Sequence, residues 1–164
     1  MVQRAENASF MPGVWVFPGG AIEPGEEPPA GAAREVAEEV AITLGDDADI
    51  LPWSRWITPE VVPVRFDTHF FVALAPPHSP PRPDGVEIAE ASWLQPRAAL
   101  AAGNAGEMKL VFPTVKNLES LLPYDSADEV LAAARGRVVE PILPRVLGTR
   151  EEHRIVLPGE PGYE

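Results

Sequence analysis

Apolar residues fall into short runs and spaced stripes that predict strands and helices in the first half of the chain. Runs rich in β-branched and aromatic residues predict strands at 13–17, 50–58 and 65–75. A fourth run, 86–94, alternates, and we expect it to pair with 65–75 across a proline-rich connection. Segment 29–42 carries an apolar stripe at helical spacing, which predicts an amphipathic helix. The stripe consists of Ala33, Val36, Ala37 and Val40.

The second half of the chain predicts helices followed by a more irregular tail. Proline lies in the first turn of the predicted helices 96–103 and 112–122, where its missing N–H does no harm. A further helix, 126–135, has Ser126 as N-cap and Glu129 three residues on, the pattern of a capping box. We expect one or two short strands in the tail. Strands and helices mix without strict βαβ alternation, so the expected class is α/β in the broad α+β sense, with helices packed on a mixed sheet.

Composition and charge restrict the partners that the chain can bind. Its 164 residues suffice for one domain with a hydrophobic core and are few for two. A net charge of −12 disfavours binding to a nucleic-acid polymer or an anionic membrane. There is no cysteine, which excludes disulfides and thiolate metal sites. No apolar run approaches the roughly 20 residues of a membrane span, and the first residues lack a signal-peptide core. We therefore expect a cytoplasmic protein with a small-molecule substrate.

Three carboxylates crowd one sector of the predicted helix 29–42, beside its apolar stripe. Glu35, Glu38 and Glu39 project within roughly 100° of one another, and Arg34 lies four residues before Glu38. Carboxylates about 5 Å apart repel each other by roughly 1 kcal/mol in water and by more where solvent is excluded. The cluster is therefore either a solvated helix face or a site for a hard cation such as Mg²⁺ or Mn²⁺, which prefer oxygen ligands.

The residues around this cluster match a longer motif. From Gly20 the chain has five residues, then Glu26, then seven residues, then "REVAEEVAI" from Arg34. This segment, 20–42, resembles the Nudix box, which is Gly, five residues, Glu, seven residues and Arg-Glu-apolar-any-Glu-Glu-any-Gly-apolar. The one departure is Ala41 in place of the last glycine. We expect either a costly left-handed backbone at Ala41 or a helix that continues to Gly45.

The resemblance implies a fold and a site. Nudix proteins are α/β/α sandwiches around a mixed sheet, so we expect one Nudix domain over 1–164 with a C-terminal helical extension over about 112–164. They typically hydrolyse nucleoside diphosphates linked to another moiety with Mg²⁺ or Mn²⁺. The implied metal ligands are Gly20, through its carbonyl oxygen, and Glu35, Glu38 and Glu39. The implied catalytic residues are Glu35, favoured as general base for the attacking water, Arg34, which would orient Glu35, and Glu38.

Residues outside these ligands are weaker candidates. Glu26 could brace the loop or bind the metal through water, and Glu90 is a candidate additional ligand. The candidates for phosphate contacts are Arg4, Arg55 and Arg65. A tryptophan could either pack in the core or stack on a base. Core packing is expected for Trp15 and Trp93, whereas either role is open for Trp53 and Trp56.

The start of the chain departs from the family pattern. Nudix domains usually place a strand and a turn before a segment like "VQRAENASFMPGVWVFPGG", and this chain begins within that segment, so the first strand is expected to be missing. Three explanations stay open: a truncated start, a rearranged region after residue 1, or a partner chain that fills the sheet edge. An uncovered sheet edge invites association, and a homodimer is one arrangement that would cover it.

Several motifs resemble one branch of the family. The segments "FMPGVWVFPGG", "RFDTHFF", "FPTVKNLESL" and "VLPGEPGY" are similar to those of a peroxisomal coenzyme A diphosphatase and its bacterial relatives. The resemblance points to coenzyme A or an acyl derivative as substrate. ADP-ribose, a dinucleotide and a damaged nucleotide are alternatives. A different alternative is a catalytically silent Nudix module that binds nucleotides.

Overall fold

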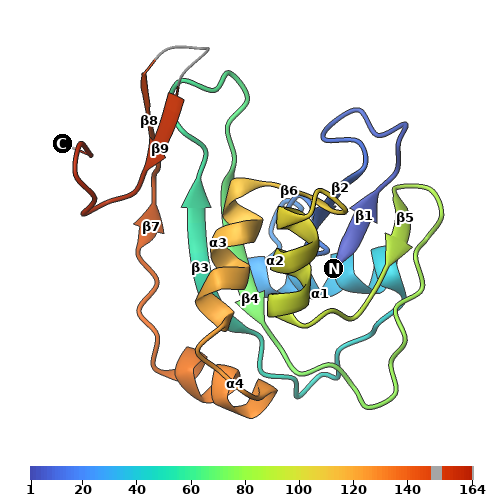
Figure 1. The fold of residues 1–164 in the computed structure, drawn as a ribbon. Helices are drawn as coiled ribbons and strands as arrows, with labels where there is room; N and C mark the ends of the chain where they lie inside the picture. Colours follow the sequence, from blue (N-terminus) through green and yellow to red (C-terminus); the bar gives the residue numbers. More distant parts are fainter. Residues whose placement is uncertain (149–152, 164) are drawn as a thin grey trace.

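The computed structural model of the protein describes residues 1–148 and 153–163. Its helices and strands alternate irregularly along the chain (Figure 1). The helices are α1 (Pro28–Val40), α2 (Pro96–Asn104), α3 (Phe112–Leu121) and α4 (Ala127–Arg135). The strands are β1 (Val2–Arg4), β2 (Val14–Val16), β3 (Leu51–Ile57), β4 (Asp67–Val72), β5 (Ile88–Ala91), β6 (Lys109–Leu110), β7 (Pro141–Ile142), β8 (Arg145–Gly148) and β9 (His153–Val156).

The strands form two mixed sheets and a separate hairpin. The first sheet has the order β5-β1-β2-β6, in which β1 is antiparallel to both neighbours and β2 is parallel to β6. The second has the order β4-β3-β7, with β3 antiparallel to β4 and parallel to β7. Strands β8 and β9 form an antiparallel hairpin beside this sheet. Both sheets therefore contain the mixed pairing that the sequence predicts.

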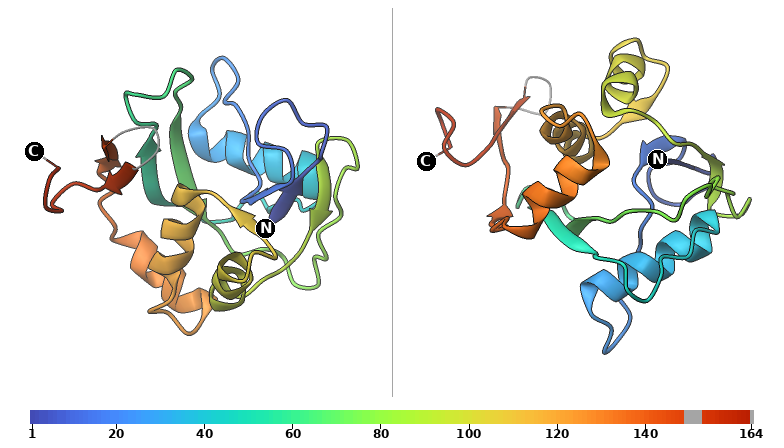
Figure 2. Two further views of the ribbon diagram at one scale, coloured as in Figure 1. Left: turned by 45° about the horizontal axis from the view of Figure 1, so that its top comes forward. Right: turned by 90° about the horizontal axis from the view of Figure 1, so that it is seen from below.

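The helices cover the strands from two sides. In the right-hand view of Figure 2, α1 lies on one side of the strands, while α2 and α3 lie on the other. The apolar stripe of α1 faces inward as predicted, because Val40 belongs to a buried cluster with Val2 of β1 and Ile88 of β5, and Val36 packs against that cluster. This arrangement confirms the predicted α/β/α sandwich, and it fixes α1 against the first sheet.

The partner predicted for segment 86–94 is wrong. Its strand, β5, pairs with β1 in the first sheet and not with β4. The connection 73–87 crosses the end of α1, where the N–H groups of Arg82 and Asp84 donate to the carbonyl oxygens of Val40 (2.8 Å) and Glu39 (3.1 Å). These two hydrogen bonds carry the chain past the helix to the other sheet, which a local hairpin signal cannot reveal.

Helix α1 ends two residues before the predicted end and does not continue to Gly45. Ala41 has a φ of 56°, in the left-handed region, and its N–H donates to the carbonyl oxygen of Ala37 at 3.1 Å. A non-glycine residue in this conformation costs on the order of 1 kcal/mol. The backbone therefore keeps the turn that a glycine would favour, with alanine in its place.

The C-terminal part contains the predicted helices and more strands than expected. Ser126 caps α4, since its hydroxyl accepts from the N–H of Glu129 at 3.3 Å, but the Glu129 carboxylate accepts from Asp125 N–H rather than from the N-cap itself. The tail holds β7, β8 and β9, and β7 adds to β3. The expected helical extension over 112–164 thus contains two helices followed by strands, and its residues 149–152 and 164 lie outside the described part.

Tryptophan placement differs from the sequence prediction at one position. Trp15, Trp53 and Trp56 are buried, whereas Trp93 is 61% exposed, so its predicted core position is wrong. The Trp93 indole N–H donates to the Ser79 carbonyl oxygen at 2.8 Å, which holds the ring on the surface of the proline-rich connection.

The predictions about the chain start and self-association stay predictions. Strand β1 begins at Val2 inside the first sheet, and β4 is an edge strand of the second. A missing first strand would concern residues ahead of this start, and no partner copy is described. Within residues 1–148 and 153–163, no helix is long and apolar enough to cross a membrane.

Candidate active site

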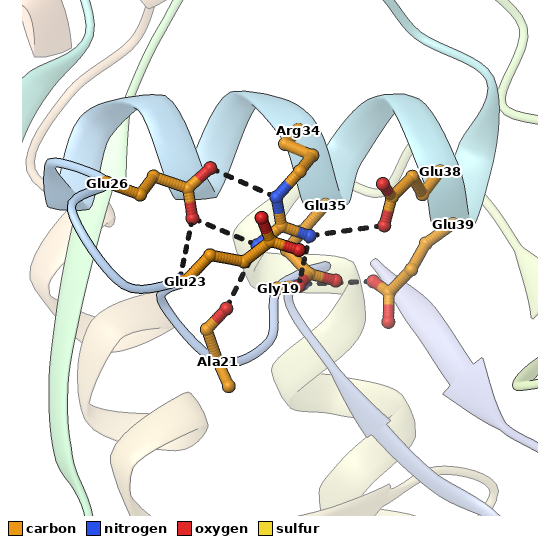
Figure 3. A network of polar contacts seen from close by, with 8 residues as sticks. All are labelled: Gly19, Ala21, Glu23, Glu26, Arg34, Glu35, Glu38 and Glu39. Carbon is orange, nitrogen blue, oxygen red and sulfur yellow. Dashed lines mark hydrogen bonds and ion pairs between the residues drawn. The ribbon is translucent and has the colours of Figure 1, made fainter.

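Arg34 is the centre of a polar network that joins α1 to the loop before it (Figure 3). Its guanidinium donates to both carboxylate oxygens of Glu26, at 3.0 and 3.1 Å, and to the carbonyl oxygen of Ala21 at 2.9 Å. Its Nη1 also donates to Glu35 at 2.8 Å and to Glu38 at 3.2 Å. The Arg34 side chain thus contacts three carboxylates and one backbone carbonyl of the loop before α1. This loop, residues 17–27, is here called the box loop.

The hydrogen bonds that Arg34 donates favour the ionised forms of Glu26 and of Arg34 itself. The hydrogen bond from Arg34 lowers the pKa of Glu26, and a second bond from the N–H of Glu23, at 3.0 Å, lowers it further. The reciprocal bonds to Glu26 and Glu35 raise the pKa of Arg34. The Glu26 carboxylate also leaves no room at Gly31, where an added Cβ would lie 2.9 Å from Glu26 Oε2. Glu26 therefore braces the box loop against the first turns of α1.

Glu39 is in a very different environment. Its side chain is 5% exposed, and its carboxylate accepts a hydrogen bond from Gly19 N–H at 2.9 Å. Burial raises the pKa of Glu39 to about 7 despite that hydrogen bond; the charges of Glu35 and Glu87 add to the rise and that of Arg4 opposes it. Among the described residues, no Lys or Arg forms an ion pair with Glu39. A buried carboxylate without a cation partner is compensated either by a proton or by a bound cation.

Two carboxylates meet at the end of the box loop. Glu35 lies directly against Gly20, where any Cβ would collide with its carboxylate, and Glu39 bonds the neighbouring Gly19. Glu38 lies apart, because its side chain is 61% exposed and reaches only Arg34. The structure thus brings together Glu35, Glu39 and Gly20 of the predicted ligands and leaves Glu38 at the rim.

The donors at this point suit a hard dication. Carboxylate and carbonyl oxygens are the ligands that Mg²⁺ and Mn²⁺ prefer. Within the described ranges, however, no three His, Asp or Glu side chains already stand together as a metal-binding group. The chemistry of the donors therefore fits the implied ion, while the three-carboxylate ligand set stays a prediction.

Of the three arginines proposed for phosphate contacts, one lies beside the carboxylates. The charge of Arg4 lowers the pKa of Glu39, which places its guanidinium near that carboxylate. Arg55 is held on the exposed face of the second sheet by two bonds to Asp67, at 2.8 and 2.6 Å. Arg65 donates to the Thr58 carbonyl oxygen at 3.0 Å, in the loop between β3 and β4. Of the three, Arg4 is the one whose charge acts on Glu39, and the phosphate contacts stay a prediction.

Sequence reasoning missed Glu87. The candidate extra ligand Glu90 is an exposed residue of β5 opposite Gln3 of β1. Glu87, just before β5, has a charge that raises the pKa of Glu39, so it acts electrostatically on the site. Nothing in the sequence separates the two, because only the pairing of β5 with β1, next to the end of α1, decides which one faces the site.

Comparisons with known proteins show which family the chain belongs to. A protein-family model described as NUDIX domain matches residues 1–115, more than half of the chain. A Caenorhabditis elegans protein described as nudix hydrolase 7 is 26% identical over 204 aligned residues, which cover 99% of this chain and 68% of that protein. The nucleoside triphosphatase NudI of Salmonella schwarzengrund strain CVM19633 is 39% identical over 57 residues, which cover 33% of this chain and 38% of NudI.

A solved structure is similar in fold. The crystal structure of a NUDIX hydrolase from Alicyclobacillus acidocaldarius superposes with a TM-score of 0.67 at 25% sequence identity. The superposition covers 80% of this chain and 86% of that chain.

Proposed function

The chain belongs to the Nudix hydrolase family, and on that basis we propose that it hydrolyses the pyrophosphate bond of a nucleoside diphosphate linked to another moiety, with Mg²⁺ or Mn²⁺. Enzymes of this family act on phosphorus-containing acid anhydrides and generally need divalent metal ions. The observation that carries the proposal is the meeting of Glu35 and Glu39 at Gly19 and Gly20, with Glu39 buried and without an ion-pair partner in the described part of the chain. Coenzyme A or an acyl derivative is the proposed substrate, supported by the branch-specific motifs in the sequence.

Each residue of the site has a proposed role in the reaction. Glu35 is the proposed general base, which takes the proton of the attacking water. Arg34 holds one oxygen of Glu35 at 2.8 Å and so fixes the direction of the carboxylate. When bound, the dication supplies charge neutralisation at the bridging and leaving oxygens. Glu39 and the Gly20 carbonyl oxygen are proposed to hold it, and Arg4 is proposed to contact a phosphate at the rim.

A silent nucleotide-binding module is the second candidate. Two observations favour it: Ala41 stands at the glycine position of the motif, and Arg34 already neutralises Glu35 and Glu38. Such a module would bind nucleotides with the same donors without turning them over.

A hydrolysis assay decides between the two. Purified protein would be incubated with Mg²⁺ or Mn²⁺ and a panel of coenzyme A, acyl-coenzyme A, ADP-ribose, dinucleotides and nucleoside triphosphates, with the products identified by mass spectrometry. We expect cleavage between the two phosphorus atoms of a linked nucleoside diphosphate. Binding without turnover on the whole panel would support the silent module and reject the enzyme.

Substitution of single carboxylates tests the assignment of roles. We expect Glu35→Gln to lower kcat by at least about a hundredfold, as for loss of a general base, and Glu38→Gln by at least about tenfold. Glu119→Gln, an exposed glutamate of α3 that pairs with Lys116, is the matched control and should act like wild type. An unchanged rate in Glu38→Gln would remove that residue from the catalytic set.

A further inference from the structure

Two exposed phenylalanines touch each other at the end of the molecule that carries the box loop. Phe10, between β1 and β2, is 45% exposed, and Phe66, between β3 and β4, is 50% exposed. Their ring centroids are 5.6 Å apart and their planes are inclined by 57°. In the left-hand view of Figure 2, both loops and the box loop rise from the same end of the fold. We call this pair the aromatic platform.

The platform is held in place by its backbone and not by burial in a core. The N–H of Phe66 donates to Thr58 Oγ1 at 3.0 Å, and its carbonyl oxygen accepts from Thr58 N–H at 2.9 Å. On the other loop, Arg4 Nε donates to the carbonyl oxygen of Phe10 at 2.9 Å. Two aromatic rings that are fixed in position yet half open to solvent favour a binding role over a packing role.

Arg4 connects the platform to the carboxylates. It belongs to β1, the indigo strand near Glu39 in Figure 3, and β1 packs through Val2 against Val40 of α1. Its guanidinium thus donates to the Phe10 backbone, while its strand lies beside the end of α1 that carries Glu39. The ring pair is thus bonded through the Phe10 backbone to Arg4, and the strand of Arg4 packs on the helix that carries the carboxylates. A nucleotide substrate would need aromatic rings for its base, a cation for a phosphate and carboxylates for a cation-bound phosphate.

We propose that Phe10 and Phe66 are the surface on which the nucleobase of the substrate stacks. The proposal rests on the proposed function, because it assumes that the carboxylate site holds the phosphates. Stacking on an aromatic side chain contributes to the affinity for each base, and every base has a suitable face. The platform therefore provides affinity for the nucleoside end with little selection among bases.

Binding of two unreactive probes tests the platform apart from catalysis. AMP and ribose 5-phosphate both carry a phosphate, but only AMP carries a base, and neither contains a pyrophosphate bond. Calorimetric titration of the full chain in Mg²⁺ is expected to show about tenfold tighter binding of AMP, the fold-change that corresponds to about 1.4 kcal/mol of stacking. The variant Phe10→Leu with Phe66→Leu should bind the two probes equally, because leucine is apolar but cannot stack.

Two further variants separate stacking from general effects. The single variant Phe66→Trp should keep or increase the wild-type preference for AMP over ribose 5-phosphate. Trp93→Leu removes a still more exposed aromatic ring from the proline-rich connection, and it should leave AMP binding unchanged. Circular dichroism and thermal melting of each variant check that the fold is kept.

The outcomes distinguish this proposal from the proposed function. Equal binding of AMP and ribose 5-phosphate by wild type, or wild-type preference in the double leucine variant, overturns the platform. If the double variant loses the preference while wild type turns over nothing in the substrate panel, the platform stands and the enzymatic proposal fails. If wild type turns over a substrate and the double leucine variant has the same KM for that substrate, the enzymatic proposal stands and the platform fails.

Discussion

At the scale of single residues, Glu39 is a carboxylate whose ionisation the folded chain opposes. Its pKa is raised from 4.5 to about 7, chiefly by burial. Between these two values the folded chain holds a proton that the unfolded chain releases, so the metal-free fold loses stability as the pH rises through this window. A bound dication would remove this cost, because it replaces the proton with a charge that favours the ionised carboxylate.

Metal affinity should therefore depend on pH. Mn²⁺ must displace the Glu39 proton below the pKa of about 7, so we expect roughly tenfold weaker binding at pH 6 than at pH 8. Titration followed by electron paramagnetic resonance measures both affinities. Glu39→Gln should bind more weakly and lose the pH dependence, whereas Glu119→Gln should keep it. Equal wild-type affinity at the two pH values would contradict the assignment of Glu39 as a ligand.

Residue chemistry is also where sequence alone was most informative. The motif positions Gly20, Glu26, Arg34 and Glu35 meet in the structure because the motif specifies a local loop–helix unit, and local spacing determines local contacts. Burial is not local, so the sequence could not show that Glu39 is buried while Glu38 is exposed. The contribution of Glu87 was hidden for the same reason.

At the scale of elements, the box loop and α1 are joined mainly through one side chain. Arg34 uses the fork of its guanidinium to hold both oxygens of Glu26, the Ala21 carbonyl and Glu35. Lysine has the same charge but cannot present parallel donors in one plane.

Arg34→Lys should loosen the box loop without unfolding the protein. We expect faster amide hydrogen exchange in residues 20–27 and a fall in kcat of at least about tenfold, because the Glu35 carboxylate loses its fixed direction. Exchange followed by mass spectrometry locates the effect. Arg55→Lys breaks a comparable two-bond contact, to Asp67, away from the loop and is the control. If both variants leave exchange in 20–27 unchanged, Arg34 does not hold the loop.

Whole helices were predictable from sequence, while strand partners were not. The stripe of α1, the proline in the first turns of α2 and α3 and the Ser126 cap all act within one element. The end of α1 is an exception that the sequence left open, since Ala41 keeps the left-handed turn despite its Cβ. The partner of β5 depends on a connection of many residues, which carries no hairpin signal of its own.

At the scale of the whole molecule, that connection links α1, β5 and the first sheet through Asp84. Its N–H donates to the Glu39 carbonyl oxygen, and its carboxylate accepts from the N–H groups of Val86, Glu87 and Ile88. Burial raises the pKa of Asp84, but the three backbone bonds outweigh it and the net pKa lies below its ordinary value. The carboxylate is thus ionised and bonded in the folded chain.

Loss of this link should destabilise the whole fold. We expect Asp84→Ala to lower the free energy of unfolding by about 1 kcal/mol at pH 7, because three backbone N–H groups, of which that of Ile88 is partly buried, lose their acceptor. Urea denaturation measures the change. The deficit should shrink as the pH falls below the ordinary Asp value of 3.8, since a lowered pKa stabilises only while the group is ionised. Asp84→Asn keeps one acceptor oxygen and should lose less; equal losses would argue against the hydrogen bonds as the cause.

Gly31 shows what a consensus pattern does not record. The Nudix box treats position 31 as a wildcard, yet here the Glu26 carboxylate occupies the volume of a side chain, and Arg34 and Glu23 N–H prevent it from moving aside. Any side chain at 31 would require Glu26 to give up part of its contact with Arg34 and the Glu23 N–H. A mutational library that randomises the unspecified positions should therefore be depleted in large residues at 31, and a chain that tolerates one there is expected to brace its loop by a different contact.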